Sequence, residues 1–403
     1  MDVRTLDDLV GDFAPGGKRI FVRVDFNVPL ERDAAGAIVV ADERRIAASL
    51  PTLRWLLERG AALIVASHVG RPEGRPDPAL SMKPIADRLA ALLGRPVGFV
   101  PSSIGETVLA RSSRLQPGDV LVLENLRFHD GEEACDPELA RALAAPAELY
   151  VNDAFGTCHR AHASVTGVPG ILPGVAGRLV EVEVAAFKKA MHEPARPVVA
   201  ILGGAKIGDK IGTIRHLRKL ADHLLIGGGM ACTFQRAQGL PVGASLVDIA
   251  ALDVAREILA ERDGAQLHLP TDWIIAKEIS SSAPYQIVPL DEVADPWRAL
   301  DIGPRTINEF VGLIKESATV LWNGPMGVFE TPPFDRGTLE VAVAIAEHPC
   351  VSLVGGGDTA RAAKKARVVD RLTHVSTGGG ASLDMLSGID LPGLAVLRGR
   401  LGA

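Results

Sequence analysis

The sequence has few aromatic residues, few cysteines and no long apolar run, and each shortage argues against a class of protein. Aromatic residues make up 4% of the 403 residues, so the hydrophobic cores must consist mainly of Ala, Val, Ile and Leu. The four cysteines lie far apart and form no CxxC pair, which argues against a disulfide framework and against a thiolate metal site. Free thiols in a reducing cytoplasm are therefore expected.

The sequence also has no excess of positive charge. The formal net charge of −6 argues against a nucleic-acid-binding surface and against a basic membrane-binding face. No apolar run approaches the length of about 18 residues that a membrane span needs, and the acidic stretch 1–13 does not resemble a secretory leader. We therefore expect a cytoplasmic protein with neither nucleic-acid nor membrane partners. A chain of 403 residues is too long for one ordinary core and predicts two domains or three.

Short apolar runs recur along the chain, and each ends at glycine or at a polar cluster. The runs are continuous rather than alternating, which indicates strands buried on both faces, as in a parallel sheet. Amphipathic stretches between them predict helices, including one over 44–59 with a kink at Pro51. Alternating strands and helices predict a doubly wound α/β fold, in which the carboxyl ends of the strands form the ligand crevice. The predicted strands are 19–24, 63–66, 120–123 and 149–151 in the first half, and 198–202, 224–226, 319–322, 350–354 and 374–376 in the second half.

Arginine and histidine concentrate after the strands of the first half. Because arginine grips carboxylate or phosphate with a planar pair of donors, several arginines at one sheet edge suit a small, multiply charged anion. Asp25 and Asn27 are suited to bind hydroxyl groups of the same ligand. A single arginine after a strand is more often a solvated or capping residue, so the prediction depends on the whole cluster. Its members are Asp25, Asn27, Arg45, His68, Arg71, Arg127, His159, Arg160 and His162.

Glycine groups follow the strands of the second half. Glycine lets backbone amides approach phosphate oxygens closely, and the N-terminus of a following helix adds a favourable dipole. Lys206 and Lys210 are four residues apart on one helix face and can both reach phosphates, although two solvated lysines are the simpler alternative. Asp358 is either a helix N-cap or a carboxylate for a metal-nucleotide complex. The glycine groups are 203–204, 227–229, 355–357 and 378–380.

Two familiar nucleotide fingerprints are absent. Neither GxxxxGK[ST] nor a convincing GxGxxG occurs, which argues against a Walker-type binder and against a nicotinamide dehydrogenase on a similar fold.

A domain boundary is predicted near the middle of the chain. The stretch 179–191 carries an apolar stripe from Val180 to Met191, and the sequence PARP at 194–197 follows it. This pattern predicts a connecting helix that ends in a rigid turn, with a new α/β unit beginning at Val198.

Eight blocks of sequence, in order from near residue 20 to near residue 390, resemble the phosphoglycerate kinase family. They are RVDFNVPL (23–30), SHVGRP (67–72), ENLRFH (124–129), NDAFGTCHRAH (152–162), LGGAK (202–206), WNGPMGVFE (322–330), GGGDTA (355–360) and STGGGAS (376–382). One departure from the family pattern is Ala299, which replaces a glycine that commonly lines the nucleotide pocket of these enzymes.

The resemblance implies two Rossmann-like, doubly wound parallel-sheet lobes joined by a hinge helix. The phosphoglycerate-binding lobe is expected at 1–178, the hinge helix at 179–193 and the nucleotide-binding lobe at 194–387, with the segment 388–403 packing back onto the first lobe. The implied reaction is reversible phosphoryl transfer between 1,3-bisphosphoglycerate with MgADP and 3-phosphoglycerate with MgATP, in glycolysis and gluconeogenesis, by a monomer whose lobes close. A non-catalytic sensor of the same ligands is the alternative.

The resemblance also implies roles for individual residues. Arg45 and Lys206, with backbone amides near Gly356 and Gly379, are expected to surround the transferring phosphoryl group, and Asp358 is expected to hold Mg²⁺. Phosphoglycerate is expected at Asp25, Phe26, Asn27, Arg45, His68, Val69, Gly70, Arg71, Arg127 and Arg160. The nucleotide is expected at Lys206, Lys210, Asn323, Glu330, Gly356, Gly357, Asp358 and Thr359.

Overall fold

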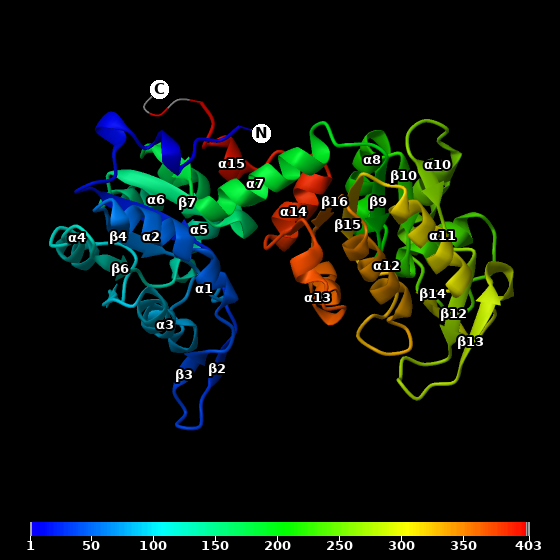
Figure 1. The fold of residues 1–403 in the computed structure, drawn as a ribbon. Coiled ribbons are helices and arrows are strands. Elements are labelled where there is room, and N and C mark those ends of the chain that lie inside the picture. The colour runs from blue at the N-terminus through cyan, green and yellow to red at the C-terminus, as the bar shows by residue number, and fades with distance from the viewer. Residues whose placement is uncertain (1, 400, 402–403) are drawn as a thin grey trace. The chain divides into compact units, whose positions relative to one another are not determined.

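The computed structural model describes residues 2–399 and 401, and the chain divides into two compact units (Figure 1). Unit 1 comprises residues 1–185 and 390–403, and unit 2 comprises residues 186–389. Each unit contains a six-stranded sheet in which every neighbouring pair of strands is parallel, with helices flanking the strands. The predicted α/β fold with two parallel-sheet lobes is confirmed.

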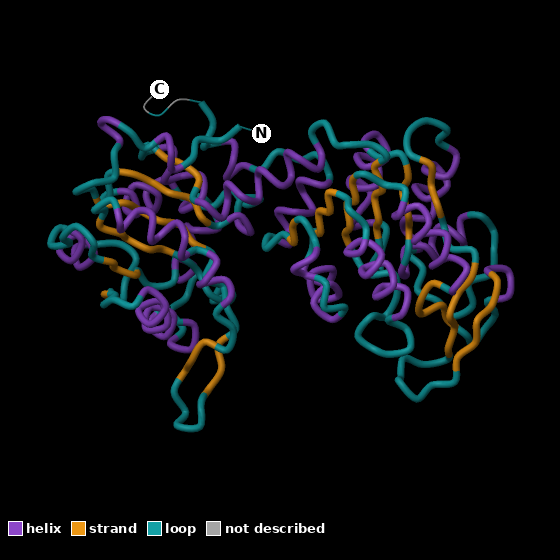
Figure 2. Tube along the Cα trace, in the orientation of Figure 1, coloured by secondary structure: helices purple, strands orange, loops and turns teal. Residues whose placement is uncertain are grey.

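The sheet of unit 1 has the strand order β5-β6-β4-β1-β7-β8. Every residue of β4 and of β7 is buried, as the continuous apolar runs predicted. A separate antiparallel hairpin, β2–β3, extends away from the sheet (Figure 2). The strands are β1 (Arg19–Val24), β2 (Leu30–Arg32), β3 (Ile38–Val40), β4 (Ala62–Ala66), β5 (Gly98–Phe99), β6 (Val120–Val122), β7 (Leu149–Asp153) and β8 (Gly174–Ala176).

The core of unit 1 joins its central strands to the helices that follow them. Val22 of β1 and Leu63 of β4 pack in one buried cluster with Leu53 of α2 and Leu89 of α3. Burial of each such side chain contributes about 1.5–3 kcal/mol. The helices are α1 (Arg44–Ala48), α2 (Leu50–Glu58), α3 (Lys83–Leu93), α4 (Glu106–Ser112), α5 (Asp130–Glu133), α6 (Pro137–Ala144) and α15 (Pro392–Ala395).

The helix predicted over 44–59 is two helices rather than one kinked helix. α1 ends at Ala48 and α2 begins at Leu50, so the interruption lies at Ser49 rather than at Pro51. Pro51 lies in the first turn of α2, where its missing N–H is tolerated, but it cannot donate to the carbonyl group of Ala47 four residues earlier. The loss of that bond ends α1 before the proline is reached.

Unit 2 contains two sheets. The larger has the order β11-β10-β9-β15-β16-β17, and a smaller antiparallel sheet has the order β13-β12-β14. The strands of the larger sheet are β9 (Val198–Leu202), β10 (His223–Ile226), β11 (Gln266–His268), β15 (Thr319–Asn323), β16 (Val351–Val354) and β17 (His374–Val375). Those of the smaller sheet are β12 (Asp272–Ala276), β13 (Tyr285–Pro289) and β14 (Arg298–Ile302).

All nine predicted strands are present within two residues at either end, whereas the smaller sheet of unit 2 was not predicted. The helices of unit 2 are α8 (Ile211–Leu220), α9 (Gly228–Ala237), α10 (Leu252–Ala260), α11 (Pro304–Lys315), α12 (Arg336–Glu347), α13 (Gly357–Lys365) and α14 (Gly379–Leu386). The boundary between the two units falls within a further helix, α7 (Arg178–Met191).

The C-terminal segment belongs to unit 1 and is held there by backbone bonds. The amide of Gly393 donates to the carbonyl of Cys158 at 2.9 Å, and the amide of Arg4 donates to the carbonyl of Leu397 at 2.9 Å. The two ends of the chain therefore pack against the same unit. Among the described residues, no helix combines the length and the apolar character that crossing a bilayer requires.

Candidate active site

The residues predicted to bind an anion lie at one edge of the sheet of unit 1. β4, β1 and β7 are neighbours in parallel register, so the segments that follow them leave the sheet on the same side. Asp25 follows β1, His68 follows β4, and Arg160 lies beyond β7. Arg127 follows β6, on the short 3-10 turn Leu126–Phe128. The fold therefore collects at one edge side chains that are far apart in sequence.

Hydrogen bonds connect the segments that follow neighbouring strands. Nη1 of Arg45, on α1, lies 2.7 Å from Oδ2 of Asp25 in an ion pair. The amide of Gly70 donates to Oδ1 of Asn27 at 3.0 Å. Phe26 is buried, and its amide donates to the hydroxyl of Ser67 at 2.8 Å. These bonds hold Asp25 and Asn27 in fixed positions relative to the segment that follows β4.

Asn125 organises the neighbouring segment. Its side-chain amide donates to the carbonyl of Val69 at 2.8 Å, and its side-chain oxygen accepts a bond from the amide of Arg127 at 3.1 Å. The guanidinium of Arg127 in turn donates through Nη1 to the carbonyl of Gly70 at 2.8 Å. Val69 and Gly70 thus contribute backbone groups that position Asn125 and Arg127.

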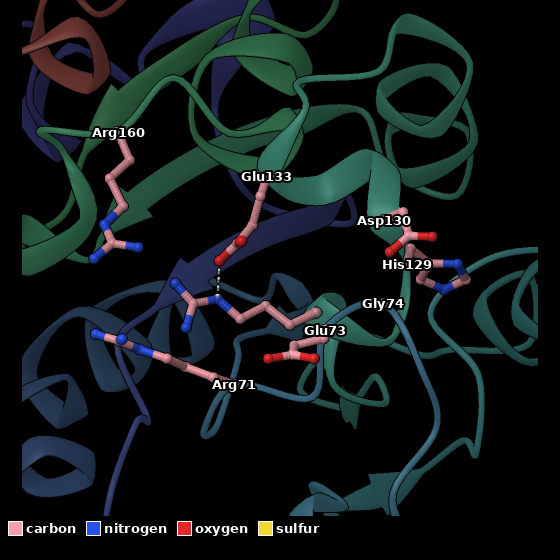
Figure 3. A pocket seen from close by; sticks show the side chains of 8 residues that line it. Arg71, Glu73, Gly74, His129, Asp130, Glu133 and Arg160 are labelled. Carbon is pink, nitrogen blue, oxygen red and sulfur yellow. Dashed lines mark ion pairs between the residues drawn. The ribbon is translucent and has the colours of Figure 1, made fainter.

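Three of the predicted arginines line one pocket of about 380 Å³, shown in Figure 3. The three are Arg71, Arg127 and Arg160, and the pocket is also lined by Glu73, Gly74, His129, Asp130 and Glu133. The side chain of Arg127 is only 7% exposed, and burial is the main cause that lowers its pKa from the ordinary value. Its Nε lies 3.0 Å from a carboxylate oxygen of Glu133, which Figure 3 marks with a dashed line.

His68 lies deeper than the arginines and is a neutral residue near pH 7. Its Nδ1 is 3.2 Å from Nη2 of Arg23, and the ring is buried. Burial, followed by the positive charges of Arg23 and Arg127, holds the pKa of His68 well below its ordinary value. His68 therefore adds hydrogen-bonding capacity to the site rather than positive charge. His162 behaves in the same way, because burial lowers its pKa to about 4.

Sequence reasoning did not single out a buried polar network beneath this edge of the sheet. Arg23 is 1% exposed, and its Nε donates to the hydroxyl of Ser164 at 2.8 Å. Glu132 is fully buried and accepts a bond from the amide of Ser164 at 3.0 Å. The available signal was Arg23 itself, a charged residue inside an otherwise apolar strand, since charged residues are rarely buried without partners.

The glycine groups of unit 2 follow neighbouring strands in the same way. β9, β15 and β16 are adjacent and parallel, so 203–204, 323–325 and 355–357 meet at one edge. Gly356 has a φ of 93°, a conformation that favours glycine, and an added Cβ would lie 2.9 Å from Nδ2 of Asn323. Gly203 packs so closely that a Cβ would lie 1.9 Å from the carbonyl oxygen of Pro325. Both positions require glycine for the loops to approach one another.

Lys210 is fixed at the centre of these loops. Its ammonium donates to the carbonyl of Gly203 at 2.6 Å and to both oxygens of Asn323, at 2.6 Å for Oδ1 and 3.1 Å for the backbone carbonyl. Burial lowers its pKa from 10.5 to about 8, partly opposed by the charges of Asp358 and Asp209. Lys210 is therefore a buried cation held by carbonyl groups and not a solvated lysine. The prediction that Lys206 and Lys210 share one helix face is wrong, because Lys206 lies outside a helix and α8 begins only at Ile211.

A second pocket, of about 440 Å³, brings together most of the predicted nucleotide-binding residues. The exposed side chain of Lys206 lies at this pocket, and the Thr359 hydroxyl accepts a 2.7 Å bond from the amide of Gly324. Glu330 lies outside the lining. The predicted residues that line the pocket are Lys206, Lys210, Asn323, Gly356, Gly357, Asp358, Thr359 and Gly379.

Two carboxylates near this pocket share one arginine. Asp358 lies 2.7 Å from Nη2 of Arg361, and Glu330 lies 3.6 Å from the same atom. Asp358 makes no side-chain cap bond in α13, whose N-cap residue is Gly356, so the predicted alternative that Asp358 is the N-cap is wrong.

Ala299, on β14, donates its amide to the hydroxyl of Ser245 at 2.8 Å and does not line the pocket.

The residues of this pocket suit a magnesium ion that arrives with a nucleotide. Mg²⁺ usually takes one or two carboxylates together with phosphate oxygens and water. The Asp358 carboxylate is 65% exposed at a pocket that also holds two lysines. No group of three or more His, Cys, Asp or Glu residues suited to a metal occurs in the described part of the chain. The accessible carboxylates of this lining are Asp358 and Asp209, and one or two carboxylates fit a metal-nucleotide complex.

Comparison with known proteins gives one consistent result. The family model for phosphoglycerate kinase matches residues 10–389. The chain is 51% identical over 382 residues to the phosphoglycerate kinase of Solibacter usitatus, covering 94% of this chain and 96% of the relative. It is 49% identical over 396 residues to that of Desulforudis audaxviator, covering 98% and 100%. The solved structure of phosphoglycerate kinase from Coxiella burnetii matches with a TM-score of 0.89 and 35% identity, covering 98% and 99%.

Proposed function

This chain belongs to the phosphoglycerate kinase family, and we propose that it moves a phosphoryl group reversibly between 1,3-bisphosphoglycerate with MgADP and 3-phosphoglycerate with MgATP. The observation that carries the proposal is the pairing of two chemically distinct pockets in one chain. One is lined by Arg71, Arg127 and Arg160, and the other by Lys206, Lys210 and glycine loops. The first suits a small polyanion and the second suits nucleotide phosphates.

The arginine pocket of unit 1 is proposed to bind phosphoglycerate. Arg71, Arg127 and Arg160 neutralise its phosphate, because guanidinium groups pair with phosphate through two bonds each. Asp25 and Asn27 bind the hydroxyl group, and Arg45 pairs with the carboxyl end. Neutral His68 donates or accepts a hydrogen bond beneath them. The remaining predicted positions, Phe26, Val69 and Gly70, support these side chains through buried and backbone contacts.

The glycine-lined pocket of unit 2 is proposed to bind the nucleotide. Lys206 and Lys210 attract its phosphates, while the amides at Gly356 and Gly357 and the hydroxyl of Thr359 lie at the start of α13, where the helix dipole favours negative charge. Asn323 fixes Lys210. Outside the pocket lining, Glu330 is proposed to bind the ribose hydroxyl groups.

Asp358 is the carboxylate that would hold Mg²⁺. When bound, the ion neutralises charge on the nucleotide phosphates. Asp358 is accessible for this purpose, but it must first release Arg361, which is itself 63% exposed. Exposed ion pairs contribute about 0–1 kcal/mol, so this release costs little.

Phosphoryl transfer needs alignment and charge neutralisation more than covalent help from the protein. Arg45 and Lys206 are proposed to contact the equatorial oxygens of the moving group, and backbone amides near Gly356 and Gly379 donate to the same oxygens. In the direction that forms ATP the attacking group is already an anion, so no general base is required. The contribution of a cation of this kind is about 10³–10⁵ in rate.

We further propose that the reaction involves closure of two lobes, 1–178 with 388–403 and 194–387, about the helix predicted at 179–193. Closure excludes water and so suppresses hydrolysis of ATP. The division of the chain within α7 into two compact units supports the presence of two lobes. A cytoplasmic monomer is the proposed working form, and light scattering after size exclusion tests the oligomeric state.

A coupled assay tests the proposed function. ATP formation from 1,3-bisphosphoglycerate and ADP is followed with and without Mg²⁺, and turnover that depends on both substrates and on the ion is expected. Binding of both ligands without turnover would instead support the non-catalytic sensor. No observation on this chain favours that alternative, and the pockets contain the cations that transfer requires.

A further inference from the structure

Glu133 lies in the arginine pocket without a role in the chemistry described above. It is the last residue of the four-residue helix α5, directly after the turn that carries Arg127. Its side chain is 58% exposed, and one carboxylate oxygen is 3.0 Å from Nε of Arg127. Figure 3 shows Glu133 directed toward the side of the pocket where the guanidinium groups of Arg71 and Arg160 also lie.

Arg127 carries a mostly buried positive charge that a negative partner stabilises. Its side chain is 7% exposed, and its buried Nε has the Glu133 carboxylate at 3.0 Å but makes no well-directed hydrogen bond with that group or with another of the described residues. The nearby charges of Arg160 and Arg23 are repulsive, and Glu133 is the largest attractive charge acting on it. A buried cation without a counter-ion is costly, so the ion pair with Glu133 stabilises the pocket when it is empty.

A phosphate or carboxylate group that binds Arg127 neutralises its charge as Glu133 does. It cannot lie at the guanidinium at the same time as the Glu133 carboxylate. Two anionic groups at one guanidinium edge repel each other, and Glu133 has an exposed side chain that can turn into solvent. We propose that Glu133 is an internal anion that occupies the phosphoglycerate site when no ligand is bound and must be displaced by the substrate, so that it sets the affinity an anion needs in order to occupy the site. This proposal rests on the proposed function, because it deepens the assignment of this pocket to phosphoglycerate.

Displacement of Glu133 carries a fixed free-energy cost. The cost raises the Kd of every anion that binds Arg127 by the same factor, whatever its own affinity. A polyanion such as 3-phosphoglycerate, which contacts several arginines, still binds, whereas a small anion such as inorganic phosphate is kept from occupying the site at ordinary concentrations. Glu133 thus protects a strongly cationic pocket from the abundant small anions of its surroundings.

The test compares Glu133→Gln with a matched control, Glu73→Gln. Both substitutions remove one negative charge from the lining of the same pocket, but among the described residues Glu73 makes no ion pair with an arginine. Calorimetry at fixed ionic strength gives the Kd of 3-phosphoglycerate and of inorganic phosphate for the wild type and both variants. Thermal unfolding is measured with and without saturating 3-phosphoglycerate.

Glu133→Gln is expected to bind both anions more tightly, by the same factor of about three to ten, because a partly buried ion pair no longer has to be broken. Glu73→Gln is expected to change neither Kd by more than about 1.5-fold, since only a screened, longer-range charge is lost. The ligand-free Glu133→Gln protein unfolds at a lower temperature than the wild type, and saturating 3-phosphoglycerate removes that difference.

Weaker binding by Glu133→Gln would overturn the inference, because it would mean that Glu133 orients Arg127 for the ligand. Equal effects of the two substitutions would also overturn it, because the pocket would then respond only to total charge. A wild-type protein that binds no 3-phosphoglycerate would instead refute the proposed function, and the inference with it. Failure of the inference alone leaves wild-type binding and turnover intact, so the two failures are distinguishable.

Discussion

The ammonium of Lys210 donates a 2.6 Å hydrogen bond to the side-chain oxygen of Asn323, and the side-chain nitrogen of Asn323 donates in turn to the carbonyl of Gly355 at 2.9 Å. Asn323 therefore links the proposed phosphate-binding lysine to the glycine loop that opens α13. A nucleotide phosphate that draws Lys210 away from its carbonyl partners acts on the loop as well. The positions of the lysine and of the loop amides are thus set together.

The first prediction concerns the pH dependence of nucleotide binding. Burial lowers the pKa of Lys210 to about 8, so the free protein holds a growing fraction of neutral amine above that pH. Nucleotide phosphates favour the ammonium form, so ADP binding at about pH 8.5 should take up a proton and should weaken as the pH rises further. Calorimetry in two buffers with different ionisation heats measures this uptake.

The matched variant for this prediction is Lys210→Arg, because a guanidinium stays protonated throughout the range. Proton uptake at pH 8.5 should disappear in the variant. The same shift makes a stability prediction: the folded pKa lies below the ordinary 10.5, so the unfolded chain binds more protons, and stability should rise between about pH 8 and 10.5. Identical proton uptake in wild type and variant would assign the uptake to another group.

A second prediction contrasts two adjacent glycines. Gly356→Ala places a side chain at a φ of 93° and 2.9 Å from Nδ2 of Asn323, and should lower the free energy of unfolding by about 1–3 kcal/mol. Gly357→Ala meets nothing within 4 Å and lies in the first turn of α13, where alanine is well tolerated. Denaturant unfolding of both variants measures the difference, and equal destabilisation would argue against strain at Gly356.

A third prediction separates two adjacent arginines at the start of α1. Arg45, paired with Asp25 at the sheet edge, is the proposed transfer residue, and Arg45→Ala should lower kcat by about 10³. Arg44 is 70% exposed and pairs with Asp42, so Arg44→Ala should retain kcat within about twofold. Steady-state assays of both variants decide between them. A loss of less than about tenfold for Arg45→Ala would remove Arg45 from the proposed role.

A fourth prediction concerns closure. If both substrates are needed to bring the lobes together, the radius of gyration from X-ray scattering should fall when 3-phosphoglycerate and MgATP are present together, and should change little with either one alone. Scattering curves that are the same for the free and the doubly liganded protein would contradict a closing mechanism and would leave the transfer chemistry to be explained without it.

Nine of the twelve strands of the two parallel sheets were predictable because each of the nine is a continuous apolar run that ends in glycine or polar residues. The antiparallel sheet β13-β12-β14 was not. β13 is mostly exposed and β14 contains charged residues at Arg298 and Asp301, so neither has the pattern of a buried parallel strand. Their pairing is decided by long-range contacts with β12, which a local sequence pattern does not report.

Some residues that line the two pockets were predictable from the sequence, and others were not. Lys206 and Lys210 follow β9 and Asp358 follows β16, and all three line one pocket because β9, β15 and β16 lie side by side in one parallel sheet. Glu133 was not predicted, since an acidic residue on a short helix is most simply a favourable charge in its first turn. Only the folded chain shows that this carboxylate lies against Arg127.

Following a labelled phosphoryl group is the most direct test that this chain transfers phosphate between ATP and 3-phosphoglycerate. The protein is incubated with 3-phosphoglycerate and Mg²⁺ together with ATP labelled at the terminal phosphate, and the label is followed into acyl phosphate and into inorganic phosphate. We expect rapid transfer to the phosphoglycerate carboxyl group, little release of inorganic phosphate, and loss of transfer in Arg45→Ala. Label that stays on ATP, or that passes only to water, would contradict this expectation.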